Sequence, residues 1–195
     1  MTNVGVIGTG HLGRHHARIY SEMEGVRLVG VADIDAARAR EIAAAFGGDA
    51  LTDFTELIDR VDAVSVAVPT DQHVAVGSRC LDAGVHVLVE KPIAPSLEGA
   101  DVLIEAADKN GRVLQVGHVE RFNPVVQAAC DVATRPQFFE VHRLNTFSFR
   151  GLDVDVVLDL MIHDIDIILS LVRSPVAEVR AVPATLDETM VLLDS

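Results

Sequence analysis

The chain has 195 residues, with 16 Lys and Arg against 29 Asp and Glu, so its formal net charge is −13. Apolar residues make up 49% and charged residues 23%, which is ordinary for a folded protein with a substantial core. The acidic balance argues against a nucleic-acid binder and against docking on an anionic membrane, because both surfaces attract basic proteins.

The first part of the chain alternates short apolar strands with helices. Strands are expected at Val4–Ile7, Arg27–Ala32, Ala63–Val68, His86–Val89 and Val113–Val116. Helices are expected at about 10–23, 35–46, 53–60, 72–83 and 96–110. The strands lack alternation of apolar and polar residues, and helices separate them. They therefore predict a doubly wound parallel sheet covered on both faces, the Rossmann α/β fold.

The pattern changes after about Arg121, and we place a domain boundary near Phe122. This divides the chain into a first domain, 1–122, and a second domain, 123–195. Further elements are expected as strands at Phe138–Phe149, Glu178–Thr185 and Thr189–Leu193 and as a helix at Asp155–Val172. They predict a second, partial α/β domain.

The remaining sequence features favour a cytoplasmic protein. Cys80 and Cys130 form no C-x-x-C pair, so neither a disulfide framework nor a thiolate zinc site is expected. The N-terminus shows no secretory signal, and no apolar stretch reaches the roughly 20 residues that span a bilayer.

A glycine-rich loop follows the first strand and opens the first helix. Its residues Gly8, Thr9, Gly10, His11, Leu12 and Gly13 fit the pattern G-x-G-x-x-G. The glycines allow a tight turn, close approach of a pyrophosphate and close packing of helix on strand. The positive end of the helix then faces the phosphates. The loop predicts dinucleotide binding; the alternatives are a turn that binds nothing and a methyltransferase loop.

Two further features near this loop bear on its ligand. Asp33 ends the second strand, where an acid hydrogen-bonds the adenine ribose, so NAD is favoured over NADP. His11 and His15 share a helix face, which would suit a metal, but no acidic or cysteine partner is near in sequence. We therefore expect no metal site, and interpret His11, His15 and His16 as solvated or phosphate-facing.

Polar residues follow two more strands, where ligands bind in open α/β sheets. Pro69, Thr70 and His73 come after one strand, and Glu90-Lys91-Pro92 after the next. Lys91 could donate to a substrate hydroxyl or act as a base after burial lowers its pKa. The alternative is a surface lysine beside an ordinary turn.

The apolar helix expected at 155–172 carries one polar stripe. Asp155, Asp159, His163, Asp166 and Ser170 are spaced three or four residues apart, so they share a face. A helix that is apolar on its other sides is expected to be buried, and its polar stripe to line a cleft. Asp159 could orient His163 for proton transfer. The alternatives are a solvated helix face and a metal site.

Together these motifs resemble the Gfo/Idh/MocA family of NAD(P)-dependent oxidoreductases. The matching segments are Gly8–Gly13, Asp33, Ala67–His73, Glu90–Pro92 and Asp159–Asp164. The resemblance implies that 1–122 is a dinucleotide-binding Rossmann domain and that 123–195 belongs to a substrate-binding or dimerisation domain built on a large open sheet. The activity that it implies is oxidation or reduction of sugar and cyclitol hydroxyls. It also implies that Lys91, Asp159 and His163 form the catalytic group, with His163 as acid/base and Lys91 on the reacting hydroxyl.

The resemblance also assigns cofactor and substrate contacts. The expected NAD contacts are Gly8, Thr9, Gly10, His11, Leu12, Gly13, Asp33, Pro69, Thr70, His73, Glu90 and Lys91. The run 117–124 is similar to members that oxidise UDP-N-acetylglucosamine at the 3-hydroxyl. The expected substrate contacts are Lys91, His118, Arg121, Asn123 and His163, with Arg121 facing an anionic nucleotide sugar.

One departure from the family concerns length, because family chains are usually much longer. A shortened second domain would leave an apolar sheet edge, which favours a homo-oligomer. Two other functions stay open: a catalytically incomplete NAD-binding regulatory module, and a reductase of a non-sugar carbonyl.

Overall fold

The computed structural model describes residues 1–133, 135–142, 157–172 and 174–181. Six parallel strands form one sheet in the order β3-β2-β1-β4-β5-β6. The strands are β1 Thr2–Ile7, β2 Val26–Ala32, β3 Asp49–Leu51, β4 Ala63–Val66, β5 His86–Val89 and β6 Leu114–Val116. The order reverses direction between β1 and β4, and at such a point the carboxyl ends of the strands open a crevice for ligands.

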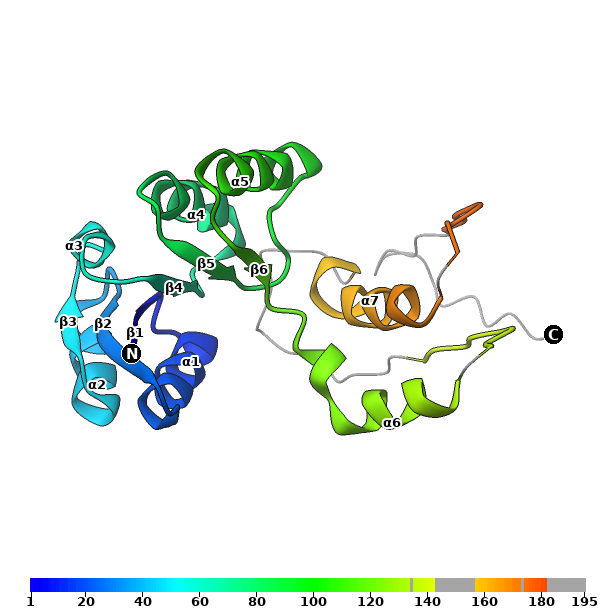
Figure 1. The fold of residues 1–195 in the computed structure, drawn as a ribbon, viewed down its shortest axis with the longest axis horizontal. Coiled ribbons are helices and arrows are strands. Elements are labelled where there is room, and N and C mark those ends of the chain that lie inside the picture. The colour runs from blue at the N-terminus through cyan, green and yellow to red at the C-terminus, as the bar shows by residue number, and fades with distance from the viewer. Residues whose placement is uncertain (134, 143–156, 173, 182–195) are drawn as a thin grey trace, which may run out of the picture.

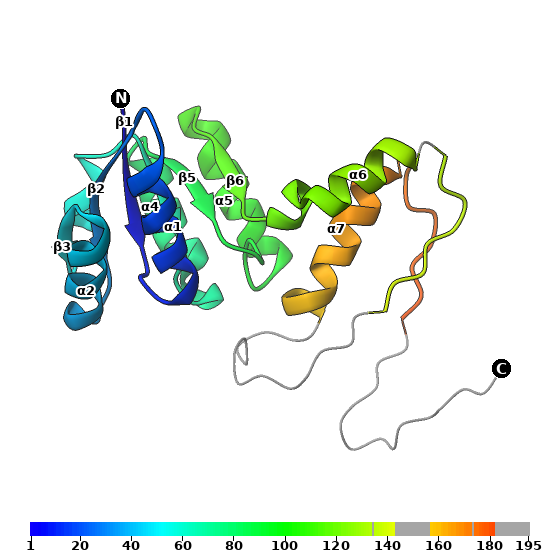
Figure 2. The ribbon, with the colours of Figure 1, turned by 90° about the horizontal axis from the view of Figure 1, so that it is seen from below.

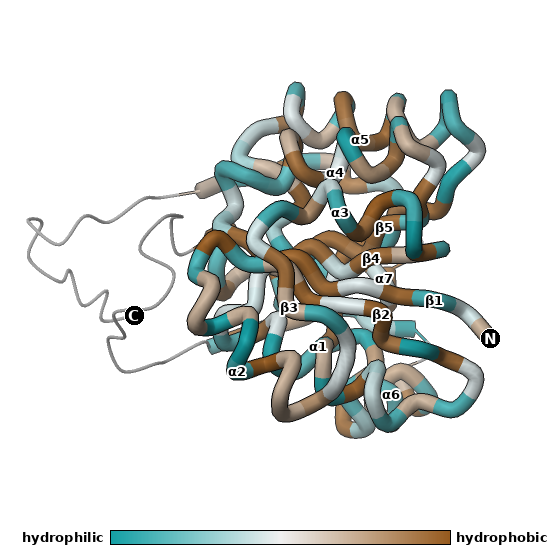
Figure 3. The backbone as a smooth tube through the Cα atoms, turned by 90° about the vertical axis from the view of Figure 1, so that its left-hand side faces the viewer, coloured by the Kyte–Doolittle hydropathy of each residue, from teal (hydrophilic) through white to brown (hydrophobic). Residues whose placement is uncertain are grey.

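Helices cover both faces of the sheet (Figure 1). Helices α1 His11–Glu22 and α2 Ala36–Phe46 lie on one side, and α4 His73–Asp82 and α5 Leu97–Asn110 on the other. The short helix α3 Thr55–Ile58 precedes β4, and the 3-10 turn η1 Thr70–Gln72 precedes α4. Figure 3 shows the apolar strands enclosed between these two helix layers. The predicted doubly wound Rossmann fold is confirmed.

Two apolar clusters form the core, one on each face of the sheet. Val66, Val89, Leu81 and Leu103 belong to the cluster under α4 and α5. Val6, Val31, Ala17 and Ile42 belong to the cluster under α1 and α2. Burying a side chain of this kind contributes about 1.5–3 kcal/mol. This two-sided core explains why the strands read as continuous apolar runs.

Beyond β6 the described chain is helical. The 3-10 turn η2 Val119–Phe122 leads into α6 Pro124–Val132, and the π-helical turn η3 Val157–Met161 leads into α7 Ile162–Leu171. Figures 1 and 2 place α6 and α7 together beside the β6 edge of the sheet. Helix α7 packs against η2, which brings it close to the end of the last strand.

Several predicted elements of this second region need correction. Strand β3 and helix α6 were not expected from the sequence. The strands predicted at 138–149 and 178–185 are wrong for 138–142 and 178–181, which carry no regular strand. The remainder of both, and the strand predicted at 189–193, lie outside the described residues. The domain boundary near Phe122 stays a prediction.

Among the described residues, no helix is both long and apolar enough to cross a lipid bilayer.

Candidate active site

The glycine loop packs more tightly than any other residue type would allow. Gly8 has a φ of +86°, and a Cβ there would lie 2.6 Å from the carbonyl oxygen of Ala67. A Cβ at Gly13 would lie 1.8 Å from the carbonyl oxygen of Gly8. Gly8 is therefore required for the turn to pass close to the end of β4, and Gly13 for α1 to approach the end of β1.

The middle glycine, by contrast, faces open space. A Cβ at Gly10 would meet no described atom within 4 Å. Gly10 is also the N-cap of α1, and no described side chain caps the first turn of this helix. Open backbone at a positive helix end is the surface that a pyrophosphate requires. The geometry of the loop fits the predicted dinucleotide.

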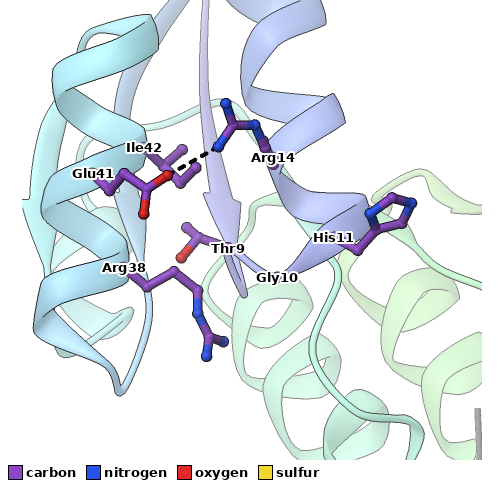
Figure 4. A pocket seen from close by; sticks show the side chains of 7 residues that line it. All are labelled: Thr9, Gly10, His11, Arg14, Arg38, Glu41 and Ile42. Carbon is purple, nitrogen blue, oxygen red and sulfur yellow. Dashed lines mark hydrogen bonds and ion pairs between the residues drawn. The ribbon is translucent and has the colours of Figure 1, made fainter. Parts of the chain in front are cut away.

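A pocket of about 430 Å³ opens beside this helix end (Figure 4). It is lined by Thr9, Gly10, His11, Arg14, Arg38, Glu41 and Ile42. Arg14 donates to Glu41 across the pocket at 3.0 Å, which links α1 to α2. In Figure 4 the ring of His11 points away from Arg38 and Glu41.

Asp33 closes the glycine loop onto β2. Its Oδ2 accepts hydrogen bonds of 2.8 Å from the N–H and the hydroxyl of Thr9, and its Oδ1 accepts one from Asp35 N. Burial raises the pKa of this carboxyl, but these bonds and the nearby Arg38 outweigh burial, so the pKa is lowered overall. Asp33 is therefore held ionised at the rim of the pocket.

Two arginines of the pocket were missed by sequence reasoning. Arg38 Nη1 lies 3.7 Å from Asp33 Oδ2, and Arg14 lines the same space. The sequence signal was modest: Asp35 caps the N-terminus of α2, which places Arg38 in the first helical turn. The pocket is therefore lined by two cations, and Asp33, the acid that favours NAD, contacts the lining residues Thr9 and Arg38.

His73, expected at the cofactor, occupies a structural position instead. Its side chain is buried, Nδ1 contacts the carbonyl oxygen of Pro92 at 2.9 Å, and Nε2 contacts that of Val68 at 3.0 Å. Both ring nitrogens are thus taken by backbone. Thr70 is also buried, while Pro69 is exposed at the end of the strand.

The structure brings together two members of the predicted catalytic group. Lys91 Nζ donates to Asp159 Oδ1 at 2.8 Å and to the Asp159 carbonyl oxygen at 2.7 Å. Lys91 follows the carboxyl end of β5, and Asp159 lies in the π turn η3, a kind of distortion common at functional sites. The Lys91 side chain is 15% exposed, so this ion pair is only partly screened by water.

His163 lies four residues beyond Asp159, in the first turn of α7. It is half-buried and close enough to Asp166 to help lower the pKa of that carboxyl. The predicted stripe is therefore present from Asp159 onward, whereas Asp155 lies outside the described residues. Ser170, at its far end, is exposed and donates to Ile167 O.

Asp166 anchors α7 to the turn after the last strand. Arg121 donates to both of its carboxylate oxygens, with 2.7 Å between Arg121 Nε and Asp166 Oδ2. The bonds from Arg121 lower the pKa of Asp166, and the nearby His118 and His163 lower it further, against the effect of burial. Arg121, expected at the substrate, already holds one carboxylate of this chain.

The other two predicted substrate residues of this turn differ in their surroundings. Asn123 caps α6: its Oδ1 accepts from Val125 N at 3.0 Å, and its Nδ2 donates to Glu120 at 3.0 Å. His118 Nδ1 is buried, 3.9 Å from Asp166 Oδ1, with no hydrogen-bond partner among the described residues. Asn123 therefore has a local structural role, whereas His118 keeps an unused polar atom.

The expectation that the 155–172 helix is buried by its apolar sides is wrong. Val157, Met161, Ile165 and Leu169 are exposed and follow one another at four-residue spacing. Within the described part of this helix, Asp166 is the residue classed as buried. The polar face is thus turned inward and an apolar stripe is turned outward.

One histidine of α1 differs from expectation, whereas His11 and His15 are exposed, as expected. His16, interpreted as solvated or phosphate-facing, turns toward the sheet, where Nε2 lies 2.8 Å from Glu90 Oε1 and Nδ1 lies 2.9 Å from Ser65 Oγ. Glu90, expected at the cofactor, is buried there. The rings of His11 and His15 lie 5.0 Å apart, edge to face. The described residues include no group of three potential metal ligands.

Ser65 and Tyr20 complete this cluster and were missed in the sequence. The one available signal was a single polar residue, Ser65, inside the apolar run Ala63–Val68. Its partners come from another element, which no local pattern reveals.

Comparison with known proteins shows which family and which solved structures this chain is similar to. Residues 2–118 match the family described as the oxidoreductase family with an NAD-binding Rossmann fold. The chain is 44% identical over 179 residues to UDP-N-acetylglucosamine 3-dehydrogenase of Acidithiobacillus ferrooxidans, covering 91% of this chain and 56% of that enzyme. A solved structure of that enzyme superposes with a TM-score of 0.88 at 41% identity, covering 96% of this chain and 61% of the other.

A second solved structure is more distant. GenD2 from gentamicin A biosynthesis, in complex with NAD, has a TM-score of 0.66 and 33% identity, over 68% of this chain and 38% of the other. The present chain thus spans little more than half the length of the dehydrogenase from Acidithiobacillus. The match over 2–118, together with the glycine loop and the Lys91 turn, shows that this chain belongs to the Gfo/Idh/MocA oxidoreductase family.

Proposed function

We propose that this protein is an NAD-dependent oxidoreductase that oxidises a sugar hydroxyl. The observation that carries the proposal is the Lys91–Asp159 pair, which joins the carboxyl edge of the sheet to the helix that bears His163. The 3-hydroxyl of UDP-N-acetylglucosamine is the favoured substrate, because the Acidithiobacillus relative is named for that reaction.

The cofactor site fits NAD in shape and charge. Gly8 and Gly13 permit the tight turn, and Gly10 leaves the helix end open for the pyrophosphate. The Asp33 carboxylate suits a ribose hydroxyl and repels a 2′-phosphate, whereas Arg38, 3.7 Å from it, would attract one. The choice of NAD rests on Asp33. When bound, NAD supplies the acceptor for the hydride.

The protein's own residues position the hydroxyl and move its proton. The Lys91 ammonium donates a hydrogen bond to the reacting oxygen and stabilises negative charge that develops there. His163 accepts the hydroxyl proton, as the general base. Asp159 holds Lys91 in place through two contacts, so the ammonium is oriented before substrate arrives.

The second domain, 123–195, and the turn that precedes it serve, in this proposal, as the substrate side of the site, and the domain also supplies a surface for a homo-oligomer. Arg121 reaches Asp166 through Nε and Nη2, which leaves the other N–H groups of its half-exposed guanidinium for an anionic substrate. His118 offers its buried ring nitrogen to the same space.

The first experiment measures melting temperature with NADH, and then with NADH plus UDP-N-acetylglucosamine. A ligand that binds the native state raises the melting temperature by mass action. We expect a rise with NADH and a further rise with the nucleotide sugar. A rise with NADH and no NAD reduction by any sugar would favour the NAD-binding module, and reduction of a carbonyl panel by NADH would favour the non-sugar reductase.

His163→Ala then tests the catalytic assignment. Removing a general base costs about 10²–10⁴-fold in turnover, while NADH affinity should be unchanged. His142→Ala is the matched control, because His142 is exposed and contacts Glu140 well away from the cofactor loop. Equal turnover in His163→Ala and in the control would contradict the role of His163.

A further inference from the structure

Lys91 sits in a turn whose two neighbouring residues are each held by a histidine. Glu90 contacts His16, and Pro92 contacts His73. We propose that His16 is a positioning residue, which fixes the Glu90 carboxylate and thereby the direction in which Lys91 presents its ammonium. The role of Lys91 in this inference rests on the proposed function. The contacts of His16 are independent of that function.

The contact of His16 is one link in a chain of side chains. Tyr20 OH lies 2.6 Å from Ser65 Oγ, Ser65 Oγ lies 2.9 Å from His16 Nδ1, and His16 Nε2 lies 2.8 Å from Glu90 Oε1. The chain starts on α1, passes through β4, returns to α1 and ends just after β5. It therefore ties one helix and one strand to the Lys91 turn.

The hydrogen-bond chemistry gives this chain a direction. An ionised carboxylate only accepts, so His16 Nε2 must donate to Glu90. In the neutral imidazole, Nδ1 then accepts from the Ser65 hydroxyl, which in turn accepts from Tyr20. Burial raises the pKa of Tyr20, more than its bond to Ser65 lowers it, so the phenol keeps its proton. Tyr20, Ser65 and His16 thus each donate one hydrogen bond to the next group, and Glu90 accepts the last one.

The hydrogen-bonded side chains Ser65 and Glu90 are buried, which indicates that their contacts have a defined role. Ser65 is fully buried and the Glu90 side chain is 9% exposed. Burying a polar group lowers stability unless the group is hydrogen-bonded. If packing alone mattered at these positions, apolar side chains would give a more stable protein. Gly117 leaves the space that the Glu90 carboxylate occupies, because a Cβ on Gly117 would lie 3.0 Å from both of its oxygens.

The far side of the turn is held independently. His73 joins the carbonyl oxygen of Pro92 to that of Val68, so the residue after Lys91 is tied to the end of β4. The Glu90 carboxylate also accepts from the N–H of Lys91 at 3.3 Å. Pro92 is thus held by the His73 ring, on one side of Lys91. Glu90, on the other side, is the residue whose position depends on His16.

Within the described part of the chain, His16 bonds to Ser65 and Glu90, so it acts on the Lys91 ammonium through Glu90 and the backbone. Losing His16 would leave the buried carboxylate with the 3.3 Å bond from the Lys91 N–H as its remaining described contact, and Glu90 would turn to find another donor. Lys91 Nζ would then spend less time against Asp159 Oδ1, 2.8 Å away in the intact site. The consequence is a more exposed and more reactive lysine.

The sequence provides a direct readout, because it holds two lysines, Lys91 and Lys109. Lys109 lies on α5 and is exposed, so it serves as an internal reference. Trace acetylation of the folded full chain with an amine-reactive ester, followed by mass spectrometry, gives the ratio of Lys91 to Lys109 labelling. This ratio reports the position of Lys91 without any turnover.

Three variants make the test. His16→Phe keeps the ring volume but removes both hydrogen bonds, His16→Gln keeps a donor for Glu90, and His15→Phe makes the same change at an exposed neighbour on α1. We expect the ratio to rise several-fold in His16→Phe, up to about tenfold for loss of one charge-assisted bond. It should return toward the wild-type value in His16→Gln and stay unchanged in His15→Phe.

An unchanged ratio in folded His16→Phe would overturn the proposal, and so would an equal rise in His15→Phe. Should His16→Phe fail to fold, Ser65→Ala removes the hydroxyl that holds His16 Nδ1 and should raise the ratio in the same direction.

Turnover separates this proposal from the proposed function. If the wild type oxidises the sugar, His16→Phe should lower kcat while NADH affinity stays constant, and His16→Gln should recover part of kcat. If the wild type has no activity but the labelling ratios behave as expected, the proposed function fails and the positioning role of His16 stands.

Discussion

The Rossmann region and the helices after it are held in place by opposite kinds of contact. In residues 2–116 the strands bury valines and leucines on both faces of the sheet, and the buried acids Asp33 and Glu90 lie just beyond the strand ends. In α7 the buried residue is Asp166, and an apolar stripe from Val157 to Leu169 lies outside. The first region is thus a self-contained core, and the second is attached to it by ion pairs.

Two pairs carry that attachment in the described chain. Lys91 holds Asp159 from the end of β5, and Arg121 holds Asp166 from the turn after β6. Each joins the carboxyl edge of the sheet to the segment that bears His163. The contacts that attach this segment are therefore the same contacts that assemble the proposed catalytic group.

The largest effect on the Rossmann side is expected from Gly13→Ala. The added Cβ would lie 1.8 Å from the Gly8 carbonyl oxygen, so the loop or α1 must move. We expect a loss of about 1–3 kcal/mol or more in stability, as for other overpacked sites, together with loss of NADH binding. Thermal unfolding and NADH titration measure the two effects.

Gly10→Ala is the matched control for this loop. Its Cβ would meet no described atom within 4 Å, so stability should change little while NADH affinity falls. Equal melting temperatures for Gly13→Ala and the wild type would contradict the packing account of the loop.

A smaller and local effect is expected from Arg121→Met on the attached side. It leaves Asp166 buried without its main donor, which costs about 1–3 kcal/mol. Hydrogen exchange should accelerate in Ile162–Leu171 and stay unchanged in Ala63–Val66. Arg18→Met is the control, since the exposed Arg18–Glu22 pair is worth only about 0.3–0.5 kcal/mol. Faster exchange in both segments would mean that α7 and the sheet unfold as one unit.

The smallest effect is a dependence on acid. The pKa of Asp166 is lowered by Arg121, so its stabilising contribution is present above the ordinary Asp value of about 4 and is lost as pH falls below it. Amide hydrogen exchange in α7, compared with that in Ala63–Val66, should therefore accelerate as the pH falls below about 4. Arg121→Met should remove most of this acid dependence; an unchanged profile in that variant would contradict the pairing.

The difference between the apolar core of the Rossmann region and the ion pairs that attach α7 also explains which features could be predicted from the sequence. Apolar runs such as Ala63–Val66, and the glycine spacing after β1, locate the sheet and the cofactor loop because local pattern and tertiary core agree there. Strand β3 escaped prediction because it is three residues long and largely exposed. Helix α6 carried a usable signal, an Asn123 cap followed by Pro at the first turn.

The candidate site was predicted in part. The resemblance placed Lys91, Asp159 and His163 in one catalytic group, and the structure pairs Lys91 with Asp159 across 68 positions of the sequence. From the residues alone we expected Asp159 to orient His163, so the pairing with Lys91 was not predicted. The roles of His16 and Ser65 could not be predicted, because their partner Glu90 is distant in sequence and no period marks the contact. The inward turn of Asp166 likewise depends on Arg121, which supplies the charge that makes a buried acid stable.

The most direct test of the account compares the wild type with Lys91→Met for NAD reduction in the presence of UDP-N-acetylglucosamine, followed as NADH absorbance, with NADH affinity measured in parallel. The account predicts sugar-dependent NADH formation by the wild type and a loss of about 100-fold or more in kcat for the variant, with NADH affinity retained. Equal rates for the two proteins, or no sugar-dependent NADH formation by a wild type that binds NADH, would contradict the account.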